Sequence, residues 1–153
     1  MCRDYYQNKQ AVLENKIIDS QGRTWHRMGD TGYFDEVGNF WIVGRVHSTI
    51  YRANTLVHPQ LVEQAACSAD KNIGRVAAVG IPDTVLGERV ILVTEGNRSL
   101  EVQAEIRAKL QEAGQQIDEI QCLDTPLPVD PRHNSKINYQ QLRTRLMSKR
   151  NRS

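Results

Sequence analysis

Residues 75–95 read RVAAVGIPDTVLGERVILVTE. Two apolar runs rich in β-branched residues, 75–81 and 89–95, flank a segment that contains a proline and a glycine. Valine and isoleucine favour strands, whereas proline and glycine favour turns. We therefore expect two core strands here, and the segments on either side complete the domain around them.

Further elements are predicted around these strands. They are a β-ribbon over 48–57, a helix that begins at Pro59, a helix capped by Ser99, a strand over 117–123 and a last helix that carries Leu142 and Leu146. From residue 46 onward the order is ribbon, helix, strand, strand, helix, strand, loop, helix. Helices that pack on a small mixed β-sheet place this part of the chain in the α+β class.

The first 45 residues have a different character. A hairpin is predicted over 33–43, where two aromatic-rich runs flank Gly38 and Asn39. A segment of about 45 residues is too short to bury a core alone. We therefore expect residues 1–45 to finish a large amino-terminal domain whose bulk lies outside this chain, and residues 46–153 to form a small carboxy-terminal domain.

The composition narrows the class of protein. The 153 residues are 39% hydrophobic and 25% charged, as in soluble globular proteins, and no apolar run approaches the roughly 20 residues that span a bilayer. Three widely spaced cysteines do not predict a disulfide framework, so a reducing cytoplasm is expected. The four histidines and three cysteines lack the short paired spacing of zinc ligands, so no metal site is predicted.

The carboxy-terminal end is basic. No acidic residue follows Asp130, although the net charge of the whole chain is only +2. A basic tail can bind the phosphates of nucleic acid, but it can also be a solvated helix end whose cations favour the helix dipole. Because no aromatic residues interleave the charges as a base-stacking surface requires, we favour the solvated helix end and expect no nucleic-acid partner.

Three segments carry a family resemblance. They read WHRMGDTGYFD (25–35), GRVHSTI (44–50), which continues to Pro59 and Glu63 of the following helix, and PVDPRHNSKI (128–137). Together and in this order they resemble segments of the adenylate-forming superfamily, which includes acyl-CoA synthetases, luciferases and the adenylation domains of peptide synthetases. The resemblance covers most of the chain and implies a small lid domain, preceded by the β-hairpin end of a large adenylation domain.

The resemblance assigns roles to four residues. Asp30 matches the aspartate whose carboxylate accepts hydrogen bonds from the ribose hydroxyls of the adenylate, and Arg45 matches the arginine that meets the same hydroxyls. His47 lies at the hinge about which the lid swings between two half-reactions, where aspartate or lysine is usual. Lys136 matches the lysine that reaches the substrate carboxylate and the α-phosphate, where a fixed cation offsets developing negative charge. The plain alternatives are a turn aspartate, a surface arginine and a solvated lysine.

Three positions depart from the family pattern. Tyr51 stands where many members have lysine, and Asn54 and Ser135 stand where glycine is usual. Asparagine tolerates a left-handed turn, so the fold is expected to survive at Asn54. Together with the segment 128–137, these changes are most similar to a bacterial branch of fatty-acid ligase relatives that includes the olefin-pathway β-lactone synthetases.

The resemblance also implies an activity for the complete protein. It would be an ATP-dependent ligase that activates a carboxylic acid, expected to be a fatty or β-hydroxy fatty acid, as acyl-AMP. ATP with Mg²⁺ would bind mainly in the large domain, since no Gly-rich phosphate loop occurs here. The sequence leaves open whether the acceptor is CoA, a carrier protein or an internal hydroxyl. The chain alone is therefore expected to be inactive, with the acid, the nucleotide and its own large domain as partners.

A second hypothesis comes from another class of protein. The chain would be a freestanding, non-catalytic, lid-like module that docks on a partner through its basic tail. An open reading frame that continues upstream into a Gly-rich phosphate loop favours the enzyme, whereas a closed frame with its own ribosome-binding site favours the module.

Overall fold

The computed structural model describes residues 6–70, 73–96, 99–131 and 136–150. The chain divides into two compact units, Met1–His47 (unit 1) and Ser48–Ser153 (unit 2), and each is described by itself. Within the described residues, no helix is both long enough and apolar enough to cross a lipid bilayer.

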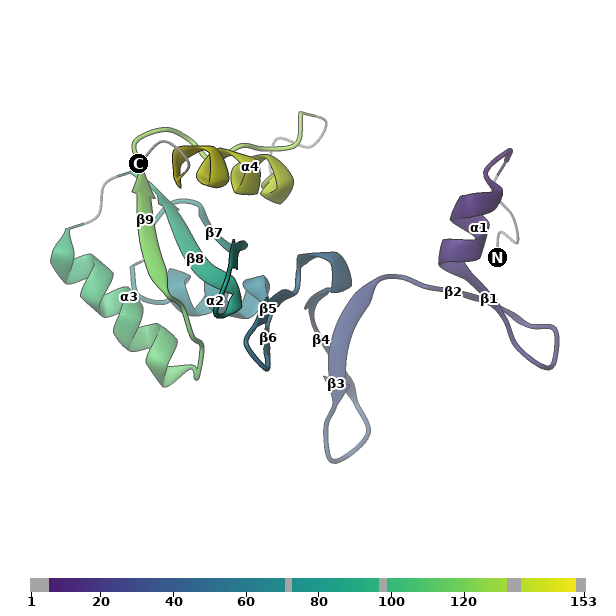
Figure 1. The fold of residues 1–153 in the computed structure, drawn as a ribbon. Helices are drawn as coiled ribbons and strands as arrows, with labels where there is room; N and C mark the ends of the chain where they lie inside the picture. The colour runs from purple at the N-terminus through teal and green to yellow at the C-terminus, as the bar shows by residue number, and fades with distance from the viewer. Residues whose placement is uncertain (1–5, 71–72, 97–98, 132–135, 151–153) are drawn as a thin grey trace. The chain divides into compact units, whose positions relative to one another are not determined.

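Unit 1 is built from a short helix and two β-hairpins. Its elements are α1 (Lys9–Asn15), β1 (Lys16–Ile18), β2 (Thr24–His26), β3 (Asp30–Phe34) and β4 (Phe40–Arg45), and the 3₁₀ turn η1 (Val46–Ser48) follows β4. β1 pairs with β2 and β3 pairs with β4, both antiparallel (Figure 1). The hairpin predicted over 33–43 is present, whereas β1 had no counterpart among the predicted elements.

The two hairpin turns share one arrangement. Asp19 and Asp35 each begin the turn, a glycine with positive φ follows three residues later, and Trp25 and Trp41 follow six residues later. The carboxylate of Asp35 accepts hydrogen bonds from the indole of Trp41 at 2.9 Å and from the side chain and backbone of Asn39. These bonds, the indole's first, lower the pKa of Asp35 to about 2. The repeated D-x-x-G-x-x-W pattern is therefore a turn-forming device.

The apolar side chains of unit 1 are mostly accessible to solvent. Among its described residues, Val43 is the only buried apolar side chain, and it is still 8% exposed. The exposed large hydrophobic residues of the β3–β4 hairpin are Tyr33, Phe34, Val37, Phe40, Trp41 and Ile42. Exposed apolar side chains are therefore concentrated on this hairpin.

Unit 2 has helices on a small mixed sheet. Its elements are β5 (Ile50–Arg52), β6 (Thr55–Val57), α2 (Pro59–Cys67), β7 (Val76–Asp83), β8 (Gly87–Glu95), α3 (Leu100–Glu112), β9 (Glu119–Leu123) and α4 (Tyr139–Arg150). The strands run β6-β5-β8-β7, with β9 parallel to β8 and the other pairs antiparallel. The predicted α+β class, with helices flanking a small mixed sheet, is confirmed.

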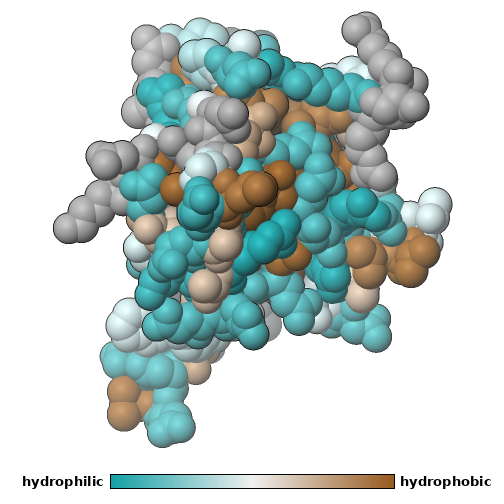
Figure 2. All heavy atoms as spheres, turned by 90° about the vertical axis from the view of Figure 1, so that its left-hand side faces the viewer, coloured by the Kyte–Doolittle hydropathy of each residue, from teal (hydrophilic) through white to brown (hydrophobic). Residues whose placement is uncertain are grey.

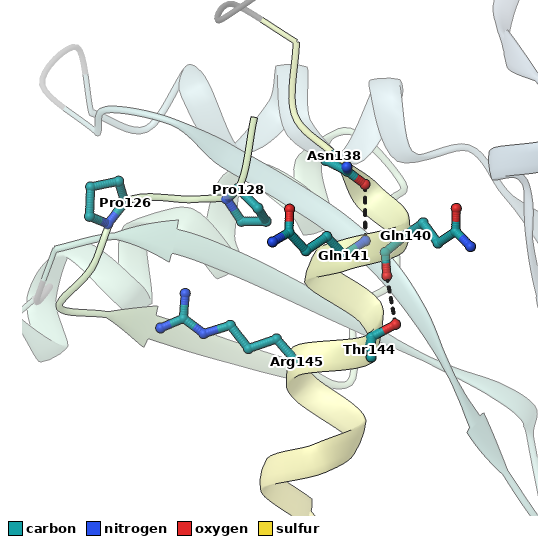
Figure 3. Close-up of a pocket in the computed structure, with 7 residues that line it drawn as sticks. All are labelled: Pro126, Pro128, Asn138, Gln140, Gln141, Thr144 and Arg145. Carbon is teal, nitrogen blue, oxygen red and sulfur yellow. Dashed lines mark hydrogen bonds between the residues drawn. The ribbon is translucent and has the colours of Figure 1, made fainter. Parts of the chain in front are cut away.

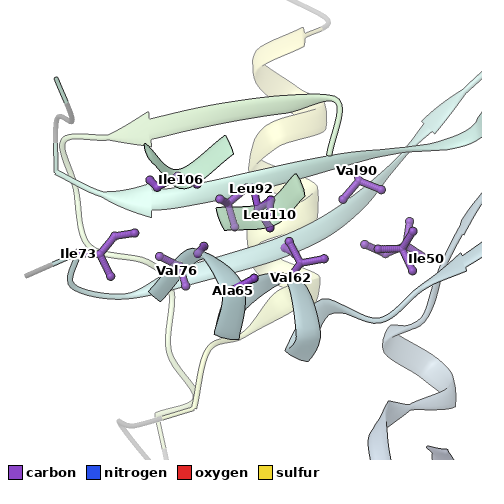
Figure 4. Close-up of a cluster of buried hydrophobic side chains, with 12 residues drawn as sticks. Ile50, Val62, Ala65, Ile73, Val76, Val90, Leu92, Ile106 and Leu110 are labelled. Atoms are coloured by element: carbon purple, nitrogen blue, oxygen red, sulfur yellow. The ribbon is translucent and has the colours of Figure 1, made fainter. Parts of the chain in front are cut away.

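Both faces of the sheet are covered, which explains the continuous apolar runs 76–81 of β7 and 90–93 of β8. On one face α2 and α3 pack on the sheet, and Val62, Leu92 and Ile106 lie in this core (Figure 4). On the other face α4 packs through Leu142 and Leu146. The outer surface of unit 2 that faces the viewer in Figure 2 is mainly hydrophilic, with smaller hydrophobic areas between. The two faces of the sheet are thus buried under helices of the same unit.

The helices begin where the sequence indicates. Pro59 occupies the first turn of α2, and the Ser99 hydroxyl accepts a hydrogen bond from the backbone N–H of Val102 at 3.4 Å. At α4 the side chain of Asn138 accepts from the N–H of Gln141 at 3.0 Å. These residues satisfy or replace backbone donors that have no partner in a first helical turn.

The β5–β6 turn differs from the expectation. The turn was expected at Ala53 and Asn54, with Asn54 tolerating a left-handed conformation, but the positive φ, +50°, occurs at Ala53. The N–H of Ala53 donates to the carbonyl of Leu86 at 2.6 Å, and the adjacent Arg52 pairs with Gly87. Pairing with the start of β8 therefore places the left-handed conformation at alanine, where it costs about 1 kcal/mol or more relative to glycine.

Ala53→Gly is expected to raise the free energy of unfolding of unit 2 by about 0.5 kcal/mol, because relief of the left-handed conformation exceeds the added chain entropy. Urea unfolding of the chain measures this change. Ala108→Gly, in the middle of α3, is the matched control and is expected to lower stability by about 1 kcal/mol. A loss of stability in Ala53→Gly would contradict the assignment of strain to Ala53.

Candidate functional site

Asp30 and Arg45 lie opposite each other in the β3–β4 ladder, at the end away from the turn. The Nε of Arg45 donates to Oδ1 of Asp30 at 2.8 Å, and its Nη1 donates to the carbonyl of Met28 at 2.7 Å. The Asp30 side chain is 22% exposed and the Arg45 side chain 52%. An accessible ion pair of this kind contributes only about 0–1 kcal/mol to stability.

A β-bulge creates this juxtaposition. Phe34 pairs with Phe40 next to the turn, and this register continues to the pair of Gly32 with Ile42. It then shifts by one residue, so that Asp30 faces Arg45 instead of Gly44. A one-residue shift moves side chains to the other face of a strand, and bulges often occur beside functional sites for that reason.

Two glycines shape the backbone around the pair. A Cβ at Gly32 would clash with the carbonyl oxygen of Trp41, so the bulged strands can approach only because this residue has no side chain. Gly29 has a φ of +75°, and its carbonyl accepts from the N–H of Val46 at 2.9 Å. This hydrogen bond joins the residue before β3 to the residue after β4, so it closes the open end of the hairpin.

A groove of about 850 Å³ in unit 1 opens beside the pair. Its lining includes Asp30 and Arg45 together with Asn15, Phe40 and His47. An ionised carboxylate accepts as many as about four hydrogen bonds, and a guanidinium donates five. The groove thus presents a hydrogen-bond acceptor and a hydrogen-bond donor side by side. This arrangement suits a ligand in which a vicinal diol lies beside a flat apolar surface.

Lys136 belongs to unit 2, on a loop that closes against itself just before α4. Its carbonyl accepts from the N–H of Asp130 at 2.8 Å, and Ile137 forms an isolated antiparallel bridge with Val129. The N–H of Asn138 donates to the carbonyl of Pro128, also at 2.8 Å. The Lys136 side chain is exposed. The neighbouring part of its motif, residues 132–135, lies outside the described residues, and Ser135 with it.

A second groove, of about 740 Å³, lies beside the base of this loop (Figure 3). Pro126 and Pro128 form one side of it, and the first turns of α4 form the other, with Gln141 and Arg145 labelled in the view. Its lining combines the two proline rings with amide, hydroxyl and guanidinium groups.

A half-buried carboxylate connects three elements of unit 2. Glu63 of α2 accepts hydrogen bonds from the hydroxyl of Tyr139 at 2.8 and 3.0 Å, and from the N–H of Ala78 in β7 at 2.9 Å. Burial raises the pKa of Glu63, and it also raises the pKa of the Tyr139 phenol, which the nearby Glu63 raises further. We name Glu63, Ala78 and Tyr139 the edge clasp, because β7 is the outer strand of the described sheet order.

The raised pKa of Glu63 predicts a pH dependence of stability. At pH values between the ordinary glutamate pKa of 4.5 and the raised pKa of Glu63, this carboxyl is more protonated in the folded chain than in the unfolded chain. The stability that Glu63 contributes is therefore fully present below pH 4.5 and is lost as the pH rises through the raised pKa. Tyr139 and Cys67, whose pKa values are also raised, remain protonated in this window.

Glu63→Gln keeps an acceptor oxygen without the charge, so its stability relative to the parent chain is expected to increase as the pH rises from 4 to 8. Urea unfolding at several pH values tests this. Glu36→Gln, which removes an exposed carboxylate in the β3–β4 turn, is the control and is expected to show little change. An unchanging difference between Glu63→Gln and the parent chain would show that burial does not perturb Glu63.

The structure brings three of the four predicted site residues together. Asp30, Arg45 and His47 line one groove in unit 1, and Lys136 is described within unit 2. The edge clasp was not among the predicted site residues. A glutamate on an otherwise apolar stripe, four residues after Pro59, was the signal in the sequence that could have indicated it.

Several known proteins resemble this chain in sequence or in fold. No family model matches the chain. It is 31% identical over 148 residues to the olefin beta-lactone synthetase of Stenotrophomonas maltophilia, covering 90% of this chain and 26% of that protein. It is 34% identical over 90 residues to an acyl-CoA ligase of Aspergillus fumigatus, covering 59% of this chain and 15% of that protein.

Solved structures show the same fold. An anthranilate CoA ligase in complex with anthranoyl-AMP superposes with a TM-score of 0.73 at 20% identity, over 94% of this chain and 27% of that one. The chain thus spans about a quarter or less of the length of these proteins. It belongs to the adenylate-forming family of AMP-dependent, acyl-CoA ligase-like proteins and has the fold of that family's carboxy-terminal domain.

Proposed function

We propose that this chain is the carboxy-terminal part of an ATP-dependent ligase that activates a carboxylic acid as acyl-AMP. The observation that carries the proposal is the ion pair of Asp30 and Arg45 on the wall of an open groove, in a chain of this family. The Asp30 carboxylate would accept hydrogen bonds from the ribose hydroxyls, and the Arg45 guanidinium would donate to the same hydroxyl oxygens.

Lys136 would act at the reacting atoms. Attack of a carboxylate on the α-phosphate brings two anions together, so a cation that is already in position lowers the barrier. The ammonium of Lys136, on an exposed side chain and a self-closed loop, can be presented to both groups. His47, in the 3₁₀ turn between β4 and unit 2, is the proposed hinge residue.

We assign residues 1–45 to the end of a large adenylation domain and residues 46–153 to the lid. The exposed hydrophobic residues of the β3–β4 hairpin support this assignment, because a large domain packed on them would remove them from water. Mg²⁺, which would neutralise phosphate charge, and most of the ATP are assigned to that domain. A fatty or β-hydroxy fatty acid is the proposed substrate, and the match over 90% of this chain to an olefin beta-lactone synthetase supports a β-hydroxy acid, since a β-lactone closes from a β-hydroxyl onto the activated carboxyl.

The test compares the chain alone with the complete enzyme. The complete enzyme is this chain preceded by a large adenylation domain, either its own or, in a chimera, that of the Stenotrophomonas relative. Exchange of pyrophosphate into ATP, dependent on a fatty or β-hydroxy fatty acid, is expected from the complete enzyme and not from the chain alone. Enzyme-like exchange by the chain alone would disprove the proposed division of labour. The absence of exchange with every acid tried would disprove the proposed activity.

A further inference from the structure

The edge clasp joins helices that lie on opposite faces of the sheet. Glu63 projects from α2, which packs on one face with Val62 and Ala66. The Tyr139 ring packs in the core that α4 forms on the other face. The hydroxyl of Tyr139 and the N–H of Ala78 meet the Glu63 carboxylate at the outer strand β7, so the link passes around the edge of the sheet.

The clasp lies close to Lys136 along the chain. Tyr139 is the first residue of α4 and follows Lys136 by three positions. Between them, Ile137 and Asn138 are tied to the other side of the loop by the bridge to Val129 and the hydrogen bond to Pro128. The loop that presents Lys136 is thus held at its base, and the clasp fixes the point where that base enters the helix.

The rest of α4 has its own attachments. Leu142 and Leu146 are fully buried, and Arg143 donates to Glu88 at 2.8 Å. Loss of the Tyr139 hydroxyl therefore leaves the body of α4 docked on the sheet and loosens only its first turn. The edge clasp is therefore not needed to hold α4 on the sheet. Its position at the base of the Lys136 loop suits the placement of that loop instead.

We propose that Glu63 and Tyr139 are positioning residues that hold the Lys136 loop in the geometry required for adenylate formation. The inference rests on the proposed function of Lys136. A charge-stabilising group acts over a short range, so a displacement of about 1 Å of its loop is enough to slow the reaction by 10-fold or more. Glu63 acts through Tyr139 and touches no substrate.

The experiment measures acyl-AMP formation and the consumption of supplied acyl-AMP by the complete enzyme. Tyr139→Phe is expected to lower kcat for acyl-AMP formation by about 10-fold with little change in KM, and to leave the consumption of acyl-AMP unchanged. Ser148→Ala removes another hydroxyl of α4, which bonds only within its own helix as far as the described contacts show, and is the matched control. Glu63→Gln, which keeps an acceptor for Tyr139, is expected to remain near the parent rate.

The combination with Lys136→Ala separates positioning from general weakening of the fold. In the Lys136→Ala background, Tyr139→Phe is expected to have no further effect on acyl-AMP formation. Three results would each overturn the inference. The first is a rate of acyl-AMP formation in Tyr139→Phe equal to that in Ser148→Ala. The others are an equal loss of rate on Tyr139→Phe with and without Lys136→Ala, and an equal loss in the formation and the consumption of acyl-AMP. If Lys136→Ala itself has no effect, the proposed role of Lys136 fails, and this inference fails with it.

Discussion

Lys136→Ala in the complete enzyme is expected to lower the rate of acyl-AMP formation by about 100-fold or more, since removal of one fixed charge-stabilising group typically has this effect. Lys136 is exposed, so the fold is expected to change little, within about 0.5 kcal/mol. Acid-dependent pyrophosphate exchange measures the rate, and urea unfolding measures the stability.

Lys149→Ala is the matched control for this prediction. It removes the same charge from the basic end of the same unit, at an exposed position of α4. If the two variants lose the same small amount of activity, Lys136 is one more solvated lysine of the tail, which was the plain interpretation of the sequence.

Asp30→Asn is expected to raise the KM for ATP by about 100-fold, because two charge-assisted hydrogen bonds to the ribose, at about 1.5 kcal/mol each, are weakened or lost. The substitution also removes the negative partner of Arg45. Initial rates at varied ATP concentration measure the effect, and deoxyadenosine triphosphate provides a second readout. Since one hydroxyl is already missing from it, this nucleotide is expected to lose less affinity than ATP on Asp30→Asn.

Glu36→Gln is the control, because it removes an exposed carboxylate from the same hairpin. Its KM for ATP is expected to stay at the parent value. An Asp30→Asn enzyme with an unchanged KM would show that the carboxylate does not bind the nucleotide, and Asp30 would then be an ordinary strand residue that pairs with Arg45.

The strands and helices of unit 2 could be predicted because they obey local rules. The continuous apolar runs at β7 and β8 reflect burial on both faces, and Pro59 and Ser99 mark helix starts by their backbone chemistry. β1, by contrast, is three residues long with two exposed isoleucines, so it has no pattern that distinguishes it from a loop. Its formation depends on pairing with β2.

Pairing also explains the other differences. The left-handed turn residue is Ala53 because the contact of the turn with Leu86 fixes the backbone there, whatever the preference of Asn54. The strand over 117–123 was predicted, but its parallel partner β8 follows from tertiary packing that a local pattern does not specify. Sequence patterns identify elements more readily than the contacts between them.

The candidate site was predictable only in part, because its contacts also depend on strand pairing and tertiary packing. The residue types and motif order indicated Asp30 and Arg45, but their direct ion pair depends on the β-bulge between Thr31 and Gly32. A hairpin register counted from the turn would have placed Gly44 opposite Asp30. The edge clasp depends on three elements far apart in the sequence, α2, β7 and α4, and no motif contains both Glu63 and Tyr139.

The most direct test of the account is a crystal structure of the complete enzyme with bound acyl-AMP. The account predicts that the Asp30 carboxylate and the Arg45 guanidinium both lie within hydrogen-bond distance, about 2.7–3.2 Å, of the ribose hydroxyls. A structure in which both side chains lie away from the sugar would contradict it.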